Sequence, residues 1–260
     1  MMEIIRSVKQ EYVSKIIHLS DYSCRSNSNY IPLYGLASIQ WAENAGLEIE
    51  VIFIAESVMN NYIDHKLRKK YKSFIISDFL NKKITNISHI VDVCGIASKK
   101  ESSLNDLIAN QENFIVFDRV LDHGNIGSII RTMRGFNFNN LILTDYNIDV
   151  YYKNIVNSSR GESFQVNCFN IKYDDIIEKF KANYQIICTK ADCDINVNKL
   201  ENNNKIKNPF VVIFGNESDG VSDKLINISN ISLGIPMKNS VDSLNIGVAA
   251  GIILNKLQDA

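Results

Sequence analysis

Four nearly continuous apolar runs constrain the fold of this 260-residue chain more than any other feature. They consist mainly of Phe, Ile, Leu and Val and span residues 114–117, 140–144, 184–188 and 210–214. Runs of this length without polar alternation predict strands buried on both faces, as in parallel sheets. Stretches of helical length separate them, so we predict an α/β domain in which helices cover a parallel sheet. Ligands of such sheets bind at the carboxyl ends of the strands.

A shorter alternation of elements precedes these runs. Residues 31–46 predict a helix that ends at Gly46. Apolar segments predict further strands at 49–54, 74–76 and 90–93. We therefore expect a small α/β domain over residues 1–98, a polar linker over 99–113 and a second domain over 114–260.

The composition limits the classes of function. A net charge of −1 argues against a protein that binds nucleic acid through its overall charge. No apolar run reaches the length of about 18 residues that a membrane span requires, and the N-terminus lacks the apolar core of a signal peptide. The five cysteines are odd in number and scattered. They favour free thiols in a reducing cytoplasm over disulfides or a metal site.

A polar segment follows the first apolar run. Asn125 stands at the expected entrance to a helix, Gly127 permits a tight connection, and Arg131 falls one turn into the helix. An Asn and an Arg at a helix N-terminus suit a phosphate or a ribose, although a helix cap and a surface arginine explain the same residues. The glycine patterns of Rossmann dinucleotide sites and of P-loops are absent.

Two more polar segments follow expected strands. Residues 215–222 place Glu217 just beyond a buried strand, where a tight capped turn is the alternative interpretation. Residues 235–252 pass from a loop with Pro236 through Ser243-Leu244-Asn245 into a helix of small and apolar residues. Such a loop offers backbone donors and acceptors to a small molecule, with a closely packed helix behind it.

The order of these segments is more specific than any one of them. Together they resemble the three motifs of the SpoU (TrmH-like) family of the SPOUT superfamily. The patterns are N-x-G-x-x-x-R, F-G-x-E-x-x-G-x-S and I-P-M-x(5)-S-L-N-x(3)-A-A-G. The resemblance covers roughly Phe114 to the C-terminus. It implies RNA ribose 2′-O-methylation with S-adenosylmethionine, without a metal, by a homodimer. It also implies a deep trefoil knot at the C-terminal end, which is a rare exception to ordinary topology.

The resemblance also assigns roles to residues. Arg131 would contact the reacting ribose and its phosphate, and would either act as or assist the base or stabilise the developing alkoxide. Asn125 would orient Arg131 or the hydroxyl, and Glu217 would hold Arg131 or the loop. Ser243 and Asn245 would hydrogen-bond the methionine moiety and the residues of the first motif. The remaining cofactor-binding positions that it implies are Thr189, Lys190, Gly215, Ile235, Met237 and Leu244.

The N-terminal domain resembles the small substrate-binding domain, similar to ribosomal proteins, that precedes many of these catalytic domains. Its expected RNA contacts are Arg25, Lys66, Arg68, Lys69 and Lys70, and the basic run 66–72 has a solvated helix face as its alternative. Arg160 would meet RNA phosphate from the partner subunit. His123 is a rival proton acceptor that the family motif does not require.

Two-domain members of the family mostly modify rRNA, so 23S rRNA is the expected substrate. Residues 116–120 and 189–197 resemble the thiostrepton- and nosiheptide-resistance methyltransferases, which act on an adenosine ribose of the GTPase-associated centre. Asn239 and Gly247 depart from many relatives, which carry Gly and Ser there. Resistance and housekeeping methylation therefore both stay open. The alternatives are tRNA ribose methylation, base methylation and a catalytically inactive RNA-binding relative.

Overall fold

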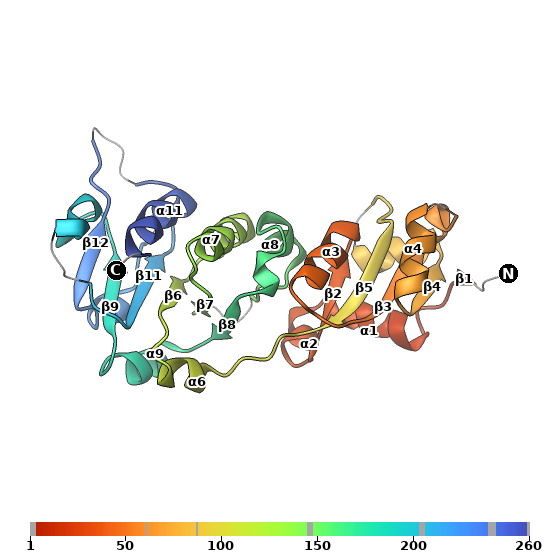
Figure 1. The fold of residues 1–260 in the computed structure, drawn as a ribbon, viewed down its shortest axis with the longest axis horizontal. Coiled ribbons are helices and arrows are strands. Elements are labelled where there is room, and N and C mark those ends of the chain that lie inside the picture. Colours follow the sequence, from red (N-terminus) through yellow and green to blue (C-terminus); the bar gives the residue numbers. More distant parts are fainter. Residues whose placement is uncertain are drawn as a thin grey trace. The chain divides into compact units, whose positions relative to one another are not determined.

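The computed structural model describes residues 4–60, 62–86, 88–144, 148–202, 206–238 and 243–258. The chain forms two compact units, Met1–Glu101 and Ser102–Ala260 (Figure 1). Within the described ranges, no helix combines the length and the apolar character needed to cross a membrane.

The N-terminal unit is a sheet covered by helices. Its elements are β1 (Ile4–Ile5), α1 (Glu11–Leu19), α2 (Tyr22–Ser26), β2 (Tyr30–Tyr34), α3 (Leu36–Asn44), β3 (Ile49–Ala55), η1 (Glu56–Val58), α4 (Tyr62–Lys70), β4 (Ser73–Ile76), α5 (Asp78–Thr85) and β5 (Val93–Ser98). The strand order is β1-β4-β3-β5-β2, with β5 antiparallel to β2 and β3. Helices α1 and α5 bury Val13, Ile16, Leu80 and Ile84 in one core against β3 and β5.

Two predictions for this unit were wrong in their boundaries. The expected helix over 31–46 is a strand to Tyr34 followed by a helix from Leu36. Gly35 separates the two with a φ of 90°, a conformation that glycine adopts without strain. The strand expected at 90–93 begins only at Val93 and continues to Ser98, because its backbone pairs with β2 and β3 throughout that stretch.

The C-terminal unit contains the four expected strands and further ones. Its elements are α6 (Leu104–Ala109), β6 (Phe114–Asp118), α7 (His123–Gly135), β7 (Asn140–Leu143), α8 (Lys153–Ser158), η2 (Glu162–Phe164), β8 (Asn167–Asn170), α9 (Tyr173–Phe180), β9 (Gln185–Thr189), β10 (Ile195–Asn196), η3 (Val197–Asn202), β11 (Phe210–Gly215), α10 (Asp223–Ile226), β12 (Ile231–Gly234) and α11 (Ile246–Leu257). The order is β10-β12-β9-β11-β6-β7-β8, and every pairing is parallel. The prediction of a parallel α/β sheet is confirmed.

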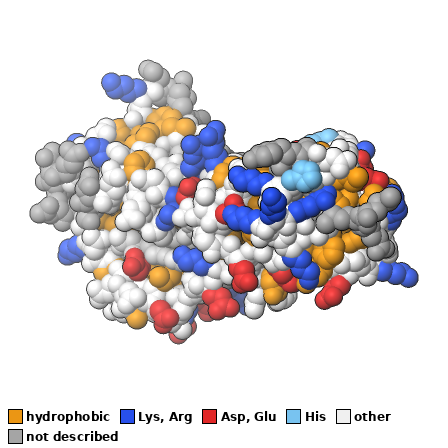
Figure 2. All heavy atoms as spheres, turned by 45° about the vertical axis from the view of Figure 1, so that its right-hand side comes forward, with side chains coloured by type: hydrophobic (Ala, Val, Ile, Leu, Met, Phe, Trp, Pro, Cys, Tyr) orange, Lys and Arg blue, Asp and Glu red, His pale blue; other side chains and the backbone are white. Residues whose placement is uncertain are grey.

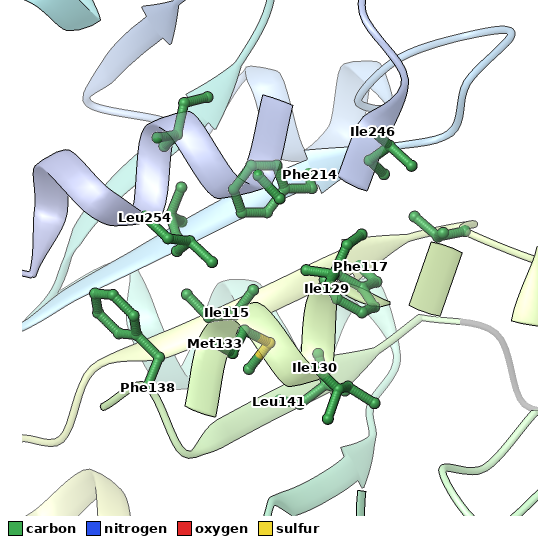
Figure 3. Close-up of a cluster of buried hydrophobic side chains, with 14 of the residues drawn as sticks. Ile115, Phe117, Ile129, Ile130, Met133, Phe138, Leu141, Phe214, Ile246 and Leu254 are labelled. Carbon is green, nitrogen blue, oxygen red and sulfur yellow. The ribbon is translucent and has the colours of Figure 1, made fainter. Parts of the chain in front are cut away.

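Successive side chains of these strands point to opposite faces, and each face has its own core. Ile115 and Phe117 join α7, α8 and α11 in one core, which Figure 3 shows in close-up. Phe114 and Val116 join α6, α9 and α10 in the other. Helices therefore cover both faces of the sheet, as Figure 1 shows.

The polar stretch expected as a linker over 99–113 is only partly a connection. Leu104–Ala109 is helix α6, which Ser103 caps by accepting a bond from the Asp106 backbone N–H. Leu104, Leu107 and Ile108 pack against the core on the α9 side of the sheet. Most of the stretch thus belongs to the C-terminal unit.

Candidate active site

A cavity of about 460 Å³ lies at the carboxyl ends of β9, β11 and β12. Its volume is within the range of about 300–1,000 Å³ that is usual for small-molecule sites. All six positions expected to bind a cofactor line it: Thr189, Lys190, Gly215, Ile235, Met237 and Leu244. Glu217 and Ser243 line it as well. The structure thus brings together residues that the sequence spreads over 56 positions, from Thr189 to Leu244.

Two strand-end glycines allow the loops around the cavity to pack closely. A Cβ on Gly215 would lie 2.1 Å from the carbonyl carbon of Gly220, and one on Gly234 would lie 2.3 Å from the Lys190 carbonyl oxygen. Both neighbours are backbone atoms and cannot swing aside. In addition, the Thr189 hydroxyl donates to the Ile213 carbonyl at 2.9 Å, which joins the ends of β9 and β11. The cavity wall is therefore held in place by main-chain contacts.

A chain of side-chain hydrogen bonds joins the three motif segments at the cavity. Asn125 Nδ2 donates to Glu217 Oε1 at 2.7 Å, and Asn245 Nδ2 donates to Asn125 Oδ1 at 3.1 Å. Two of these residues also belong to helix starts. The Asn125 backbone N–H donates to the N-cap Asp122 of α7, and Asn245 caps α11 by accepting from the Gly247 N–H. The helix cap fixes the amide of Asn245, and the side-chain bonds to Glu217 and Asn245 orient the amide of Asn125.

Arg131 lies on α7 with an exposed side chain. It makes no hydrogen bond or ion pair with the residues that the structure describes. The next arginine on the helix, Arg134, differs: its Nε forms an ion pair with Glu162 at 3.3 Å. Arg131 thus keeps all five guanidinium N–H donors for another molecule. His123 begins the same helix and stacks on Tyr152, with the ring centroids 4.7 Å apart.

A buried carboxylate holds the loop that carries Glu217. Asp118, at the end of β6, is fully buried. Its Oδ2 accepts the Ser222 backbone N–H at 2.7 Å, and its Oδ1 accepts the Tyr173 hydroxyl at 2.6 Å. Burial, followed by this bond to Asp118, raises the pKa of Tyr173. Asp118 is missing from the site predicted by sequence, although a charged residue directly after a buried strand is a usable signal.

The start of α11 packs closely on α7. A Cβ on Gly247 would lie 3.1 Å from the Ser128 hydroxyl oxygen and 3.1 Å from Asn245 Oδ1. A serine at this position would crowd the amide that reaches Asn125. Glycine at position 247, where many relatives carry serine, therefore allows the close contact between α11 and α7. The other departure, Asn239, lies outside the described residues.

Arg25 was wrongly predicted as an RNA contact. Its side chain is only 2% exposed, and Nη1 donates to the Leu19 carbonyl at 2.9 Å and to the Ser20 carbonyl at 3.1 Å. The guanidinium fastens the end of α1 to α2 instead of facing solvent. The polar residues that follow it, Ser26 and Asn27, are exposed.

The other expected RNA contacts lie at the surface in different degrees. Lys66, Lys69 and Lys70 are exposed on α4, with Lys70 paired to Glu43. Arg68 is half-buried and donates to the Met59 carbonyl at 2.9 Å. Lys and Arg side chains gather on the face of this unit that Figure 2 presents. Arg160 is exposed after α8 in a left-handed conformation with a φ of 52°.

Sequence reasoning also missed apolar walls of the cavity. Leu233 comes from β12, and Ile246, Ala249 and Ile253 come from α11. The last three recur at helical spacing, so a helix with one face toward a ligand was detectable in principle. Their role could not be separated from ordinary core packing without the fold.

Comparison with known proteins finds relatives in sequence and, separately, solved structures of similar fold. The chain is 31% identical over 156 residues to the 23S rRNA (adenosine(1067)-2′-O)-methyltransferase of Streptomyces azureus, which covers 59% of this chain and 57% of that protein. It is 25% identical to the enzyme of the same name from Streptomyces laurentii, over 96% of this chain and 87% of that protein. The chain thus spans little more than half of the first relative's length and most of the second's.

Solved structures share the fold of the whole chain. The SpoU methyltransferase AviRb of Streptomyces viridochromogenes, in complex with AdoMet, superposes with a TM-score of 0.79 at 20% identity, over 96% of this chain and 98% of that one. An AdoMet-bound rRNA methyltransferase from Sinorhizobium meliloti gives 0.78 at 22% identity, over 99% and 98%. The model of the SpoU rRNA Methylase family matches residues 112–255, which is more than half of the chain. The protein belongs to the SpoU rRNA methylase family.

Proposed function

We propose that this protein is an S-adenosylmethionine-dependent methyltransferase that modifies a ribose 2′-hydroxyl in large-subunit rRNA. The observation that carries the proposal is the hydrogen-bonded chain Glu217–Asn125–Asn245 at the cavity. It joins the three motifs by which the family is defined at one place. Arg131, on the same helix as Asn125 and without a partner among the described residues, supplies a positive charge for the developing alkoxide.

The cavity fits the cofactor in size and chemistry. Apolar side chains from β12 and α11 suit an adenine ring, and the strand ends supply backbone groups for polar recognition. The crowded glycines keep the loops where a small molecule can approach the backbone. Thr189, Lys190, Gly215, Ile235, Met237 and Leu244 would hold the cofactor. When bound, S-adenosylmethionine supplies an electrophilic methyl group.

The protein must align the ribose oxygen and help it to lose a proton, because a hydroxyl is a poor nucleophile at neutral pH. Arg131 would place its charge beside the developing alkoxide, which is the stabilisation that an oxyanion needs. A protonated guanidinium is a poor proton acceptor, so we assign it electrostatic support. Asn125, held between Glu217 and Asn245, would orient the ribose.

We further propose the deep knot and the homodimer. The strand order supports the knot: β11 lies between β6 and β9, and β12 lies between β9 and β10. The late strands therefore enter between strands laid down earlier. Val248 and Ile252, one turn apart on α11, support the dimer, since they are 53% and 38% exposed. An apolar helix face of this kind suits a subunit contact.

The choice of RNA rests on the relatives. Those from S. azureus and S. laurentii are named for adenosine 1067 of 23S rRNA, and one from Bacillus subtilis is named for guanosine 2553. Because the named nucleotides differ, we propose rRNA as the substrate class and place the protein in the cytoplasm. Resistance to a thiopeptide-type antibiotic and housekeeping methylation are the two roles compatible with this substrate.

The proposal is tested by incubating the protein with S-adenosylmethionine and either 23S rRNA or tRNA, then mapping reverse-transcription stops at low dNTP. We expect a single stop on 23S rRNA that depends on the cofactor. Calorimetry with S-adenosylmethionine provides an independent measurement. Absence of cofactor binding at millimolar concentration would favour an inactive RNA-binding protein, and a stop only on tRNA would overturn the substrate assignment.

A further inference from the structure

An unusual surface lies on α5 of the N-terminal unit. Phe79 is 73% exposed there. Lys82, Lys83 and Asn86 are exposed as well. Phe79, Lys82 and Lys83 stand at positions i, i+3 and i+4, so they form one stripe along the helix, and Asn86 follows as its left-handed C-cap. We call this stripe the α5 face.

The helix cannot turn to bury Phe79. Its opposite side contributes Leu80 and Ile84 to the core of the unit. Asn81 is fully buried and forms two bonds with Val91: Nδ2 donates to the carbonyl at 2.7 Å, and Oδ1 accepts the N–H at 3.0 Å. Ser77 caps the start of the helix. The aromatic ring is thus presented by a fixed element.

The charges around the ring favour an anionic partner. Lys82 and Lys83 make no ion pair or hydrogen bond with the described part of the chain. The neighbouring acid, Asp78, is occupied, since its Oδ1 accepts from the Ser57 N–H at 3.2 Å and from the Ser57 hydroxyl at 3.1 Å. Glu56, the residue before Ser57, forms an ion pair with Arg6 at 3.1 Å. Among the described residues, neither carboxylate forms an ion pair with Lys82 or Lys83, so both ammonium groups are available to an anionic partner.

We propose that the α5 face binds an unpaired nucleotide of the RNA substrate. Phe79 stacks on the base, and Lys82 and Lys83 contact the flanking phosphates. Stacking on an aromatic ring requires a base outside a duplex, because paired bases expose only their edges. A protein partner is disfavoured, since lysines are depleted in the centres of protein interfaces. This inference rests on the proposed function and identifies which surface of the N-terminal unit selects the RNA.

The experiment measures affinity of the full-length protein for the rRNA fragment that carries the mapped methylation. Phe79→Ala should raise the Kd about tenfold, because base stacking contributes on that scale. Phe79→Trp should bind like the wild type, while Phe79→Leu, which keeps apolar area but not a ring, should bind like Phe79→Ala. Lys82→Gln/Lys83→Gln should weaken binding and lower the slope of log Kd against log salt by about 1.4, or about 0.7 per phosphate contact on a single strand.

Matched controls separate a local loss from a general one. Lys172→Gln/Lys181→Gln removes the same charge from exposed positions around α9 and should leave the salt slope unchanged. S-adenosylmethionine affinity and the unfolding midpoint should match wild type in every variant, because the α5 face is exposed and belongs to the other unit. If Phe79→Ala or Phe79→Leu bound RNA as tightly as the wild type, the assignment of the α5 face as an RNA-binding surface would be overturned. Methylation by the wild type would still uphold the proposed function in that case. A wild type that binds no RNA would overturn both.

Discussion

Arg131 and Arg134 lie on one helix but in different environments. Arg134 is paired with Glu162, whereas Arg131 is exposed and has no partner among the described residues. Residue type alone does not distinguish them. The motif spacing identified Arg131 because it counts residues from Asn125. The buried state of Arg25 lacked any such signal, since Nη1 donates to the backbone carbonyls of Leu19 and Ser20, which no residue pattern predicts.

We predict that Arg131→Ala lowers the rate of methyl transfer at least about 10²-fold, the loss usual for a group that stabilises an oxyanion. The affinity for S-adenosylmethionine should change less than about threefold, because Arg131 does not line the cavity. Single-turnover transfer of labelled methyl groups measures the first, and calorimetry the second. Arg131→Lys should retain part of the rate, since it keeps charge without the planar fork. Undiminished turnover in Arg131→Ala would show that its role is misassigned.

Asp118 offers a second prediction at this scale. Asp118→Ala leaves the Ser222 N–H and the Tyr173 hydroxyl without their acceptor. An unsatisfied buried donor costs about 1–3 kcal/mol, so the free energy of unfolding should fall by that order. Cofactor affinity should fall too, because the loop with Glu217 loses its anchor. Tyr173→Phe is the matched control: it removes one bond and should cost about 1 kcal/mol. Equal stability of Asp118→Ala and wild type would contradict the anchoring role.

The elements of the C-terminal unit were predictable because buried parallel strands leave a plain signal. Each expected run coincides with β6, β7, β9 or β11 to within one residue. The short strands β8, β10 and β12 carry weaker patterns, and their burial depends on neighbours distant in sequence. The error at 31–46 has the same cause. Only the pairing of β2 with β5 decides that Ile31–Tyr34 is a strand.

The contact between α7 and α8 can be tested with two glycines of α7. A Cβ on Gly127 would lie 1.9 Å from the Ser158 hydroxyl and 2.7 Å from the Ile155 carbonyl oxygen. Gly135 has nothing within 4 Å. We predict that Gly127→Ala destabilises the protein by about 1–3 kcal/mol through overpacking. Gly135→Ala should be neutral or stabilising by up to about 1 kcal/mol. Urea unfolding measures both, and similar effects of the two changes would contradict the close contact.

At the scale of the molecule, the sequence predicted two α/β units and the residues around one cavity. The sheet order, the Asp118 anchor and the exposure of Phe79 could not be predicted, because each depends on which distant segments meet. Motif residues were easier to find than the surfaces that recognise RNA. A catalytic group must stand at a fixed spacing from its neighbours, whereas a binding surface is built from ordinary Lys and Phe residues on any exposed helix.

Partly buried tyrosines lie in both units and predict sensitivity to alkali. Burial raises the pKa of Tyr34 in one unit and of Tyr151 in the other. The unfolded chain therefore loses these protons first, from about pH 10 upward. Each phenol then lowers the free energy of unfolding by up to about 1.4 kcal/mol per pH unit until its folded-state pKa is reached. Denaturant unfolding at pH 8 and pH 11 should show the loss, and Tyr34→Phe and Tyr151→Phe should each reduce it. A pH dependence unchanged by both substitutions would contradict the raised pKa of these two tyrosines.

The central claim is that the protein methylates a ribose with a cofactor held in the cavity and with the help of Arg131. It is tested most directly by digesting modified 23S rRNA to nucleosides and identifying the labelled product by mass spectrometry. We predict one 2′-O-methylated nucleoside, formed by the wild type and missing with Arg131→Ala. A methyl group on a base, or equal product from Arg131→Ala, would contradict the account.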